Sequence, residues 1–200
     1  MSNLKETILN PILKGNPITV LVLGICSSLA VTVQLKGALV MALSVTIVTG
    51  LSSLVVSLLR NTIPNRVRII VQLVVVAMMV ILVDQVLKAY AYAIDKQLSV
   101  YIGLIITNCI LMGRIEAFAL GNKPIPSLLD GLSNGVGYGL ILIIVAFFRE
   151  LLGSGTLLGM RVLPAGYIPN NLVILPPFAL ILLGCIIWVH RACDKELQEK

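Results

Sequence analysis

Residues 69–88 read IIVQLVVVAMMVILVDQVLK, and this stretch decides the class of the fold. An α-helix rises about 1.5 Å per residue, so about 20 apolar residues cross the roughly 30 Å hydrocarbon core of a bilayer. The whole 200-residue chain has the same character, with 58% hydrophobic residues, 12% charged residues and a mean hydropathy of +1.02. A water-soluble domain requires more surface charge than this. The sequence therefore predicts an all-α polytopic membrane protein.

Apolar blocks of the same kind recur along the chain. The connectors between them contain the glycines, prolines and charges that end helices, and none is long enough for a second domain. We therefore expect a single membrane domain over residues 1–200. Residues 1–16 contain Lys5, Glu6 and Lys14 without a small-residue cleavage site, so we do not expect them to be a cleaved signal peptide. The six predicted spans are residues 18–33, 39–59, 69–88, 99–113, 135–152 and 172–190.

Two of the predicted spans are shorter or more polar than the other four. They are residues 18–33 and 99–113, and each is the first of three consecutive spans. Three crossings per half make the second half enter the membrane from the opposite face, so we expect an inverted repeat with halves at about 1–95 and 96–200. Short or broken helices at matching positions of such halves indicate a site near the membrane midplane.

The distribution of basic residues predicts the orientation of the chain. With the N-terminus in the cytoplasm, ten of the 15 Lys and Arg residues lie inside, in agreement with the positive-inside rule. Arg60 and Lys123 are among these ten, whereas Lys36 and Arg149 lie outside. Both termini are therefore expected in the cytoplasm. The net charge of +6 does not indicate nucleic-acid binding, because the basic residues stand singly between apolar blocks.

One cysteine lies near the middle of each short segment, Cys26 in LGICSSL and Cys109 in ITNCILM. The inverted repeat would bring both thiols to the same depth in the membrane. A free cysteine in a helix is most often a small packing residue, and composition alone favours that interpretation. The neighbouring Gly, Ser, Thr and Asn residues favour a binding site, because they let the backbone and hydrogen-bond donors approach a metal-bound thiolate.

Short sequence blocks carry a family pattern over nearly the full length of the chain. They are NP at 16–17, LGIC at 23–26, LAVT at 29–32, IPN at 63–65, VRIIVQ at 67–72, VDQ at 83–85, KQLSV at 96–100, GLIITNC at 103–109, GR at 113–114, EAFA at 116–119 and FRELLG at 148–153. Together these blocks resemble the D-subunit family of the sodium-translocating NADH:quinone oxidoreductases. They resemble the E subunit of the Rnf electron-transport complex more distantly, with Asp84-Gln85 closer to the sodium-pumping family.

The resemblance implies a subunit of a six-subunit complex in the bacterial inner membrane, surrounded by lipid. It implies that NADH and flavins bind other subunits, and that electron transfer to a quinone such as ubiquinone is coupled to sodium export. The family cysteines that match Cys26 and Cys109 ligate an intramembrane iron–sulfur cluster, expected to be 2Fe-2S. A homologous E-type sister subunit supplies two more thiolates, in agreement with the usual four ligands. Cys185 and Cys193 have no partner in the repeat, so we do not expect them to be ligands.

Several charged residues fall in or near the predicted spans. Charge is costly inside a membrane and is therefore often functional, so Asp84 and Asp130, the latter placed just before the fifth span, are candidates for attracting a cation. We favour structural roles for both: a helix cap or, for Asp84, a pair with Lys88 four residues later. The Arg149-Glu150 dipeptide closes the fifth predicted span, where we expect an ion pair or a subunit contact.

No catalytic residue is expected in this chain, and no complete active site. Gly135, Gly137 and Gly139 suit close packing of membrane helices better than phosphate binding, and His190 is expected to be an interfacial residue. The predicted function is electron relay coupled to sodium export. The alternatives are a subunit of an Rnf-type ferredoxin:NAD complex, an inverted-repeat secondary transporter or ion channel with incidental cysteines, and a purely structural assembly subunit.

Overall fold

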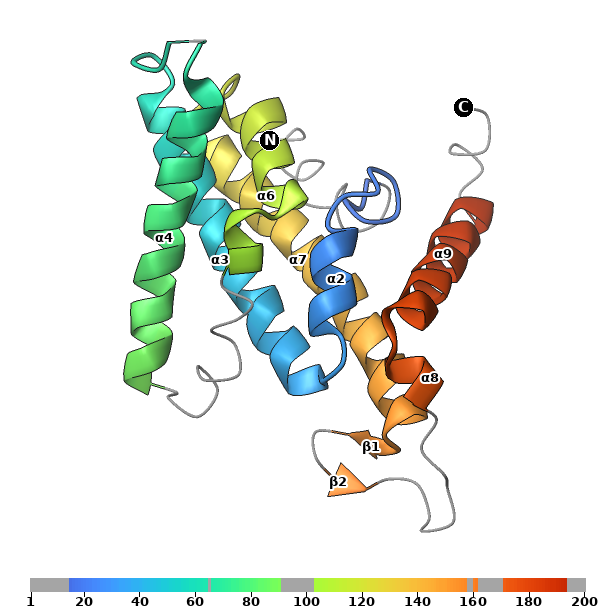
Figure 1. Cartoon of the computed structure of the whole chain (residues 1–200). Coiled ribbons are helices and arrows are strands. Elements are labelled where there is room, and N and C mark those ends of the chain that lie inside the picture. The colour runs from blue at the N-terminus through green and yellow to red at the C-terminus, as the bar shows by residue number, and fades with distance from the viewer. Residues whose placement is uncertain (1–14, 65, 91–102, 158–159, 162–170, 194–200) are drawn as a thin grey trace.

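The computed structural model describes residues 15–64, 66–90, 103–157, 160–161 and 171–193. Within these ranges the chain is a bundle of helices, as the composition predicts (Figure 1). Residues 1–14, the connector at 91–102 and residues 194–200 lie outside the described residues. The predictions about the leader segment and the location of the termini therefore stay predictions.

Three of the described helices are long and apolar enough to cross a membrane. Two of them, α3 and α4, begin and end close to the spans predicted at 39–59 and 69–88, because an unbroken apolar run is read directly from the sequence. The third, α7, begins well before its predicted start. The three helices are α3 (Leu35–Leu59), α4 (Arg68–Tyr90) and α7 (Pro124–Gly153).

The centre of the bundle is the pair α3 and α7, which share the largest contact between any two described elements. Figure 1 shows these two helices side by side, with α4 against the outer side of α3. Small residues make the close approach possible: a Cβ atom at Gly135 would lie 2.6 Å from the Cα of Thr46. A Cβ atom at Gly131 would lie 2.8 Å from the carbonyl oxygen of Thr49. The predicted packing role of Gly135 and Gly139 is confirmed, and both face α3.

We expect Gly135→Ala to destabilise the folded chain by about 1–3 kcal/mol, because the new methyl group overlaps the backbone of Thr46, which has no flexible end that could move aside. The measurement is the midpoint of thermal unfolding of the purified protein in detergent. Gly184→Ala is the matched control, since that helical position has no atom within 4 Å of an added Cβ. Equal loss of stability in both variants would contradict the close packing of α3 on α7.

The two cysteine-bearing segments are short helices, as expected. Helix α2 (Ile25–Val31) has 7 residues, so it covers only about 10 Å at 1.5 Å per residue. It follows Gly24, whose positive φ of 82° a side chain would strain. Helix α6 (Cys109–Arg114) has 6 residues and continues into the π-helical turn η1 (Ile115–Ala119). Neither segment crosses a membrane as one continuous helix, and residues 99–102 of the predicted fourth span lie outside the described residues.

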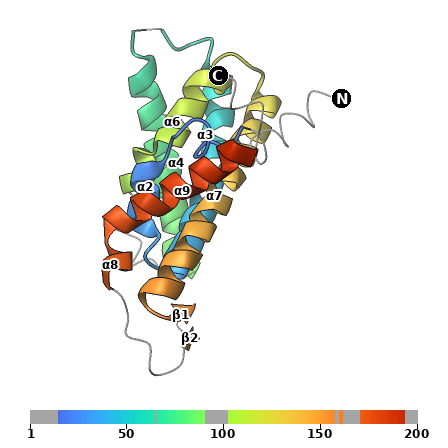
Figure 2. The ribbon, with the colours of Figure 1, turned by 90° about the vertical axis from the view of Figure 1, so that its right-hand side faces the viewer.

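Two of the predicted spans have different boundaries in the structure. The fifth was expected to begin at 135, but α7 begins at Pro124, because its polar and glycine residues are accommodated against α3. The sixth is divided into α8 (Asn171–Ile174) and α9 (Pro176–Cys193), since Pro176 and Pro177 interrupt the helix. The connector before it contains strands β1 (Thr156–Leu157) and β2 (Met160–Arg161), a small antiparallel ladder in an otherwise helical structure. Figure 2 shows α9 crossing α7 at an angle.

Candidate functional site

The structure brings the two cysteine-bearing segments together. Cys26 is the second residue of α2 and Cys109 is the first residue of α6. The residue after Cys26 contacts the residue before Cys109. Asn108 Nδ2 donates a hydrogen bond of 3.4 Å to Ser27 Oγ. Both cysteines are free thiols and both are exposed on the surface of the chain. The two short helices therefore begin beside each other, and their thiols remain accessible to a partner or a metal centre.

Two glycines let the segments pack closely around this point. A Cβ atom at Gly24, just before α2, would lie 2.6 Å from Cδ1 of Ile110 in α6. A Cβ atom at Gly113 in α6 would lie 3.1 Å from Cδ1 of Leu23. In each short segment, therefore, a glycine packs against a large apolar side chain of the other segment. A larger residue at Gly24 would require Ile110 to move and would also strain the backbone, whose φ is 82°.

The donor set of this chain fits half of an iron–sulfur site. Such clusters usually take four thiolate ligands, and here two exposed thiols lie on adjoining helices. Within the described ranges, no group of three or more His, Cys, Asp or Glu side chains is placed to hold a metal ion. A complete cluster would therefore need ligands from outside these ranges or from another chain. The exposure of Cys26 and Cys109 is what such sharing requires.

The other two cysteines lie in α9. The Cys185 thiol is free and exposed, and it lines an apolar groove of about 490 Å³ beside Phe148 and His190. Cys193 is the last residue of α9. No described contact joins Cys185 to Cys26 or Cys109, and its assignment as a non-ligand stays a prediction. His190 lies in the last turn of α9, the position expected for an interfacial residue.

The two acidic candidates are both paired. Asp84 Oδ2 accepts a hydrogen bond of 2.5 Å from Lys88 Nζ, so the predicted pair is confirmed. Asp130 was expected just before the fifth span, and that placement is wrong because Asp130 lies inside α7. Its side chain is 4% exposed and accepts hydrogen bonds from both Nε and Nη2 of Arg114, with 3.0 Å for the first of these bonds. Asn134 Nδ2 also donates to Asp130, at 3.1 Å.

Arg149 is buried near the end of α7, where it is 1% exposed. Its guanidinium group donates to Thr32 Oγ1 at 2.6 Å and to the carbonyl oxygen of Leu29 at 3.1 Å, both at the end of α2. It also donates to the carbonyl oxygens of Val173, at 3.4 Å, and Ile174, both in α8. A cation at the C-terminal ends of two helices satisfies carbonyl groups that have no partner within the helix.

Glu150 holds the start of α3. Its carboxylate accepts a hydrogen bond of 2.6 Å from the backbone N–H of Leu35, the first residue of that helix. We expected an ion pair or a subunit contact at this dipeptide; no ion pair is among the described contacts of Arg149 and Glu150, and the subunit contact stays a prediction. Instead the dipeptide binds the connector between α2 and α3 from both sides, which is a contact within the chain.

The comparisons with known proteins agree with this architecture. A family model described as an Rnf-Nqr subunit, a membrane protein, matches residues 4–187. The chain belongs to the Rnf-Nqr family. A protein of Aeromonas salmonicida (strain A449) is 56% identical over 100% of this chain and 98% of its own length. A protein of Haemophilus influenzae (strain PittGG) is 57% identical over 98% of this chain and 97% of its own length. Both are named as the D subunit of the Na(+)-translocating NADH-quinone reductase, so the resemblance seen in the sequence is confirmed.

Sequence reasoning missed several polar contacts of this Rnf-Nqr chain. Gln72 Nε2 of α4 donates to Glu116 of the π-helical turn at 2.7 Å, and Arg68 forms an ion pair with the same carboxylate. Arg114 pairs with Asp130 as described above. The sequence did indicate that such contacts exist, because basic and acidic residues in apolar surroundings usually form ion pairs. The partners cannot be matched from the sequence alone, because they lie on different helices.

Proposed function

We propose that this chain is a D-type membrane subunit of a bacterial Na⁺-translocating NADH-quinone reductase, and that Cys26 and Cys109 are two ligands of an iron–sulfur cluster inside the membrane. The observation that carries the proposal is the hydrogen bond between Ser27 and Asn108, which joins the two cysteine-bearing helices while both thiols stay exposed. The names of the full-length relatives support the choice of complex.

The remaining two thiolates would come from a homologous E-type sister subunit. A four-thiolate 2Fe-2S cluster needs two more ligands than this chain offers at the site. Exposed thiols on one subunit are suited to closing such a site against another, whereas buried thiols would serve packing. The shared centre would therefore lie at the interface of two membrane subunits within the larger complex.

A metal centre at this depth has a plain physical use. Electrons taken from NADH, which binds with the flavins on other subunits, would have to cross a hydrocarbon core of about 30 Å. A bound iron–sulfur group supplies a site that accepts and returns one electron, which divides this distance. The residues of this chain bind and orient that group, and the small and polar side chains around them allow its potential to respond to nearby charge. Such a response would link electron transfer to sodium export.

The inverted repeat of six spans is supported by two matching contacts. Near the end of α3, Arg60 Nη1 donates at 2.8 Å to the carbonyl oxygen of Asn122, in the connector between η1 and α7. Near the end of α7, Arg149 donates to Leu29 and Thr32, at the end of α2 and just before the connector to α3. In both cases the long helix of one half holds the connector after the short helix of the other half. Two halves inserted in opposite directions would produce this reciprocal pattern.

The same contacts support the proposed orientation. Arg60 bonds to Asn122, the residue before Lys123, and Glu150, the residue after Arg149, bonds to Leu35, the residue before Lys36. These two contacts lie at opposite ends of α3 and α7, which run side by side in Figure 1. The positive-inside count puts Arg60 and Lys123 in the cytoplasm and the other pair outside. With this orientation, helix α9 ends on the cytoplasmic side, which agrees with cytoplasmic termini.

The proposal is tested by replacing the cysteines one at a time in the intact complex. We expect Cys26→Ser and Cys109→Ser each to remove one iron–sulfur signal in electron spin resonance, to lower the iron content, and to stop electron transfer from NADH to quinone. Cys185→Ser is the matched control, since it replaces another free and exposed thiol in a helix of the same chain. We expect it to retain the iron, the signal and the activity.

The alternatives predict different outcomes of the same experiment. A secondary transporter or channel with incidental cysteines would contain no iron, and both cysteine variants would be fully active. A purely structural subunit would keep electron transfer in both variants, provided that the complex assembles. Full iron content and full turnover in Cys26→Ser and Cys109→Ser would therefore contradict the proposal. An Rnf-type complex would lose the same signal but would oxidise ferredoxin with NAD as acceptor.

A further inference from the structure

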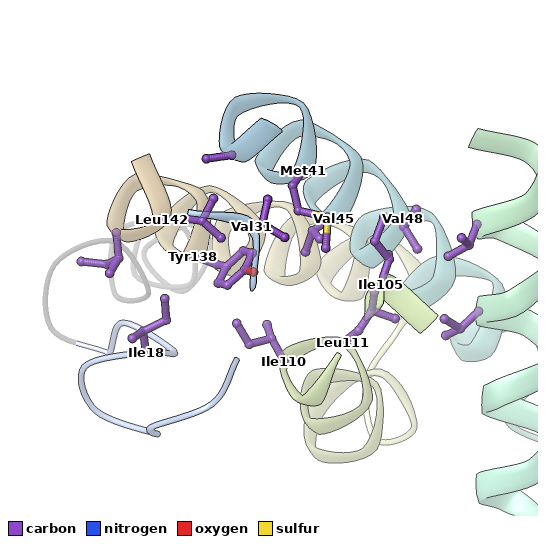
Figure 3. Close-up of a cluster of buried hydrophobic side chains, with 14 of the residues drawn as sticks. Ile18, Val31, Met41, Val45, Val48, Ile105, Ile110, Leu111, Tyr138 and Leu142 are labelled. Atoms are coloured by element: carbon purple, nitrogen blue, oxygen red, sulfur yellow. The ribbon is translucent and has the colours of Figure 1, made fainter. Parts of the chain in front are cut away.

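Tyr138 lies where the two cysteine-bearing helices meet α7. It is 0% exposed, and its ring packs within the apolar core among Ile18, Ile110 and Leu142, as Figure 3 shows. A buried tyrosine usually has a hydrogen-bond partner for its hydroxyl group. Here that group is 2.8 Å from Ser27 Oγ. The aromatic ring therefore brings a polar atom from α7 to the position directly after Cys26.

The Ser27 hydroxyl has three hydrogen-bond partners, namely Gly24, Asn108 and Tyr138. Ser27 Oγ donates to the carbonyl oxygen of Gly24 at 3.0 Å. It accepts from Asn108 Nδ2 at 3.4 Å. A serine hydroxyl has one hydrogen to donate and two lone pairs to accept with. The hydrogen bond between the Ser27 and Tyr138 hydroxyl groups can run in either direction, and it joins the two residues in both cases.

The other end of this network begins the second short helix. Asn108 is the residue before Cys109, and its Oδ1 accepts from the backbone N–H of Ile110 at 3.1 Å. This is an N-cap, which fixes the first turn of a helix. A continuous chain of hydrogen bonds therefore runs from Tyr138 through Ser27 and Asn108, and it touches the neighbour of each cysteine.

We propose that Tyr138 is a positioning residue that sets the relative placement of Cys26 and Cys109, and through it the reduction potential of the centre they hold. This inference rests on the proposed function, because it concerns the metal centre that the two thiols would bind. Tyr138 acts through Ser27, the residue that follows Cys26, and no hydrogen bond from its hydroxyl group to a thiol is among the described contacts. The potential of an iron–sulfur centre depends on the hydrogen bonds and dipoles around its ligands. Removal of the Tyr138 hydroxyl group from this network changes both the dipoles near the thiols and the placement of the two helices.

The test is a redox titration of the purified complex, followed by electron spin resonance of the iron–sulfur centre. We expect Tyr138→Phe to retain full iron content, because both thiols remain. At a fixed ambient potential near the midpoint, the ratio of reduced to oxidised centre should change by at most about fivefold, the factor reached if the whole free energy of one ordinary hydrogen bond depended on the oxidation state. The spectrum should also broaden, since the ligands are held less uniformly. Ser27→Ala should change the titration and the spectrum in the same way.

Ser28→Ala is the matched control. Ser28 is the next residue of the same helix and is also buried, but its hydroxyl donates at 2.7 Å only to the carbonyl oxygen of Ile25, within its own helix. We expect its titration to equal that of the unmodified complex. An unchanged titration and spectrum in both Tyr138→Phe and Ser27→Ala would overturn the inference, as would an equal shift in Ser28→Ala.

The cysteine variants separate the failure of this inference from the failure of the proposed function. If Cys26→Ser and Cys109→Ser lose the signal while Tyr138→Phe and Ser27→Ala titrate normally, only the positioning role of Tyr138 is contradicted. If the cysteine variants keep their iron and their signal, both proposals are overturned. Iron content and spectra are measured on the complex without turnover, so these outcomes do not depend on the enzyme being active.

Discussion

Arg149→Met is expected to lower the free energy of unfolding by about 3–5 kcal/mol. The arginine donates to acceptors in two different helices, at the end of α2 and in α8. Each buried acceptor that loses its donor costs about 1–3 kcal/mol. Removing the buried guanidinium charge also removes the cost of keeping that charge away from water. The expected loss of stability is therefore smaller than the summed costs of the unpaired acceptors. The measurement is the thermal unfolding midpoint of the purified complex in detergent.

Two further variants make the result specific. Arg149→Lys keeps the positive charge. A single ammonium group cannot reach acceptors in two helices as the planar guanidinium group does, so we expect a loss of stability between those of the wild type and Arg149→Met. Arg191→Met is the matched control, because Arg191 is exposed and donates one described bond, to Val20 at 3.3 Å. Its effect should stay within about 0.5 kcal/mol. Equal unfolding midpoints for Arg149→Met and Arg191→Met would show that the buried contacts of Arg149 contribute little.

Asp130→Ala is the second large effect, expected at about 3–5 kcal/mol. It would leave the Arg114 guanidinium group, which is 19% exposed, without its bidentate carboxylate. An uncompensated buried charge is more costly than the loss of the pair as a whole. We therefore expect the double variant Arg114→Met/Asp130→Ala to recover much of the stability lost in the single variant. A double variant that is less stable than Asp130→Ala would contradict this explanation.

Glu116→Gln is the control for this prediction. Glu116 also pairs with an arginine, Arg68, but both side chains of that pair are 39% exposed. Exposed pairs contribute about 0–1 kcal/mol, since water solvates the charges when the pair is broken. The replacement glutamine also keeps an acceptor for Gln72, which bonds to Glu116 in the structure. The difference between Asp130→Ala and Glu116→Gln measures how much burial adds to a salt bridge in this bundle.

The sequence was most informative where burial follows from hydropathy alone. Helices α3 and α4 were predicted within a few residues, because continuous apolar runs in a membrane protein have no other stable structure than a helix. The short segments at Cys26 and Cys109 were also predicted, since polar and glycine residues interrupt their apolar runs. The matching positions of these two interruptions directed attention to Cys26 and Cys109, whereas their assignment as ligands came from the resemblance to the family and stays a prediction.

The start of α7 was missed because a hydropathy count treats its first turns as a connector. Residues 130–135 read DGLSNG, which is typical of a loop, yet they are helical. The glycines there pack against α3, and Asp130 is neutralised by Arg114 from a different helix. Neither compensation is visible without the neighbouring helix. The same limit applies to Tyr138, which reads as an ordinary apolar position until its hydroxyl meets Ser27.

The contact of Arg149 with the end of α2 has a consequence for the order of biosynthesis. Leu29 and Thr32 are made early, but the side chain that satisfies them lies 120 and 117 residues later in the chain. While only the first half is in the bilayer, the end of α2 lacks this anchor, and Ser27 lacks its partners Tyr138 and Asn108. Insertion of the second half, with α7, completes the anchorage. If Cys26 and Cys109 hold the proposed cluster, iron and sulfide would be bound only after the second half, which contains Cys109, has been made.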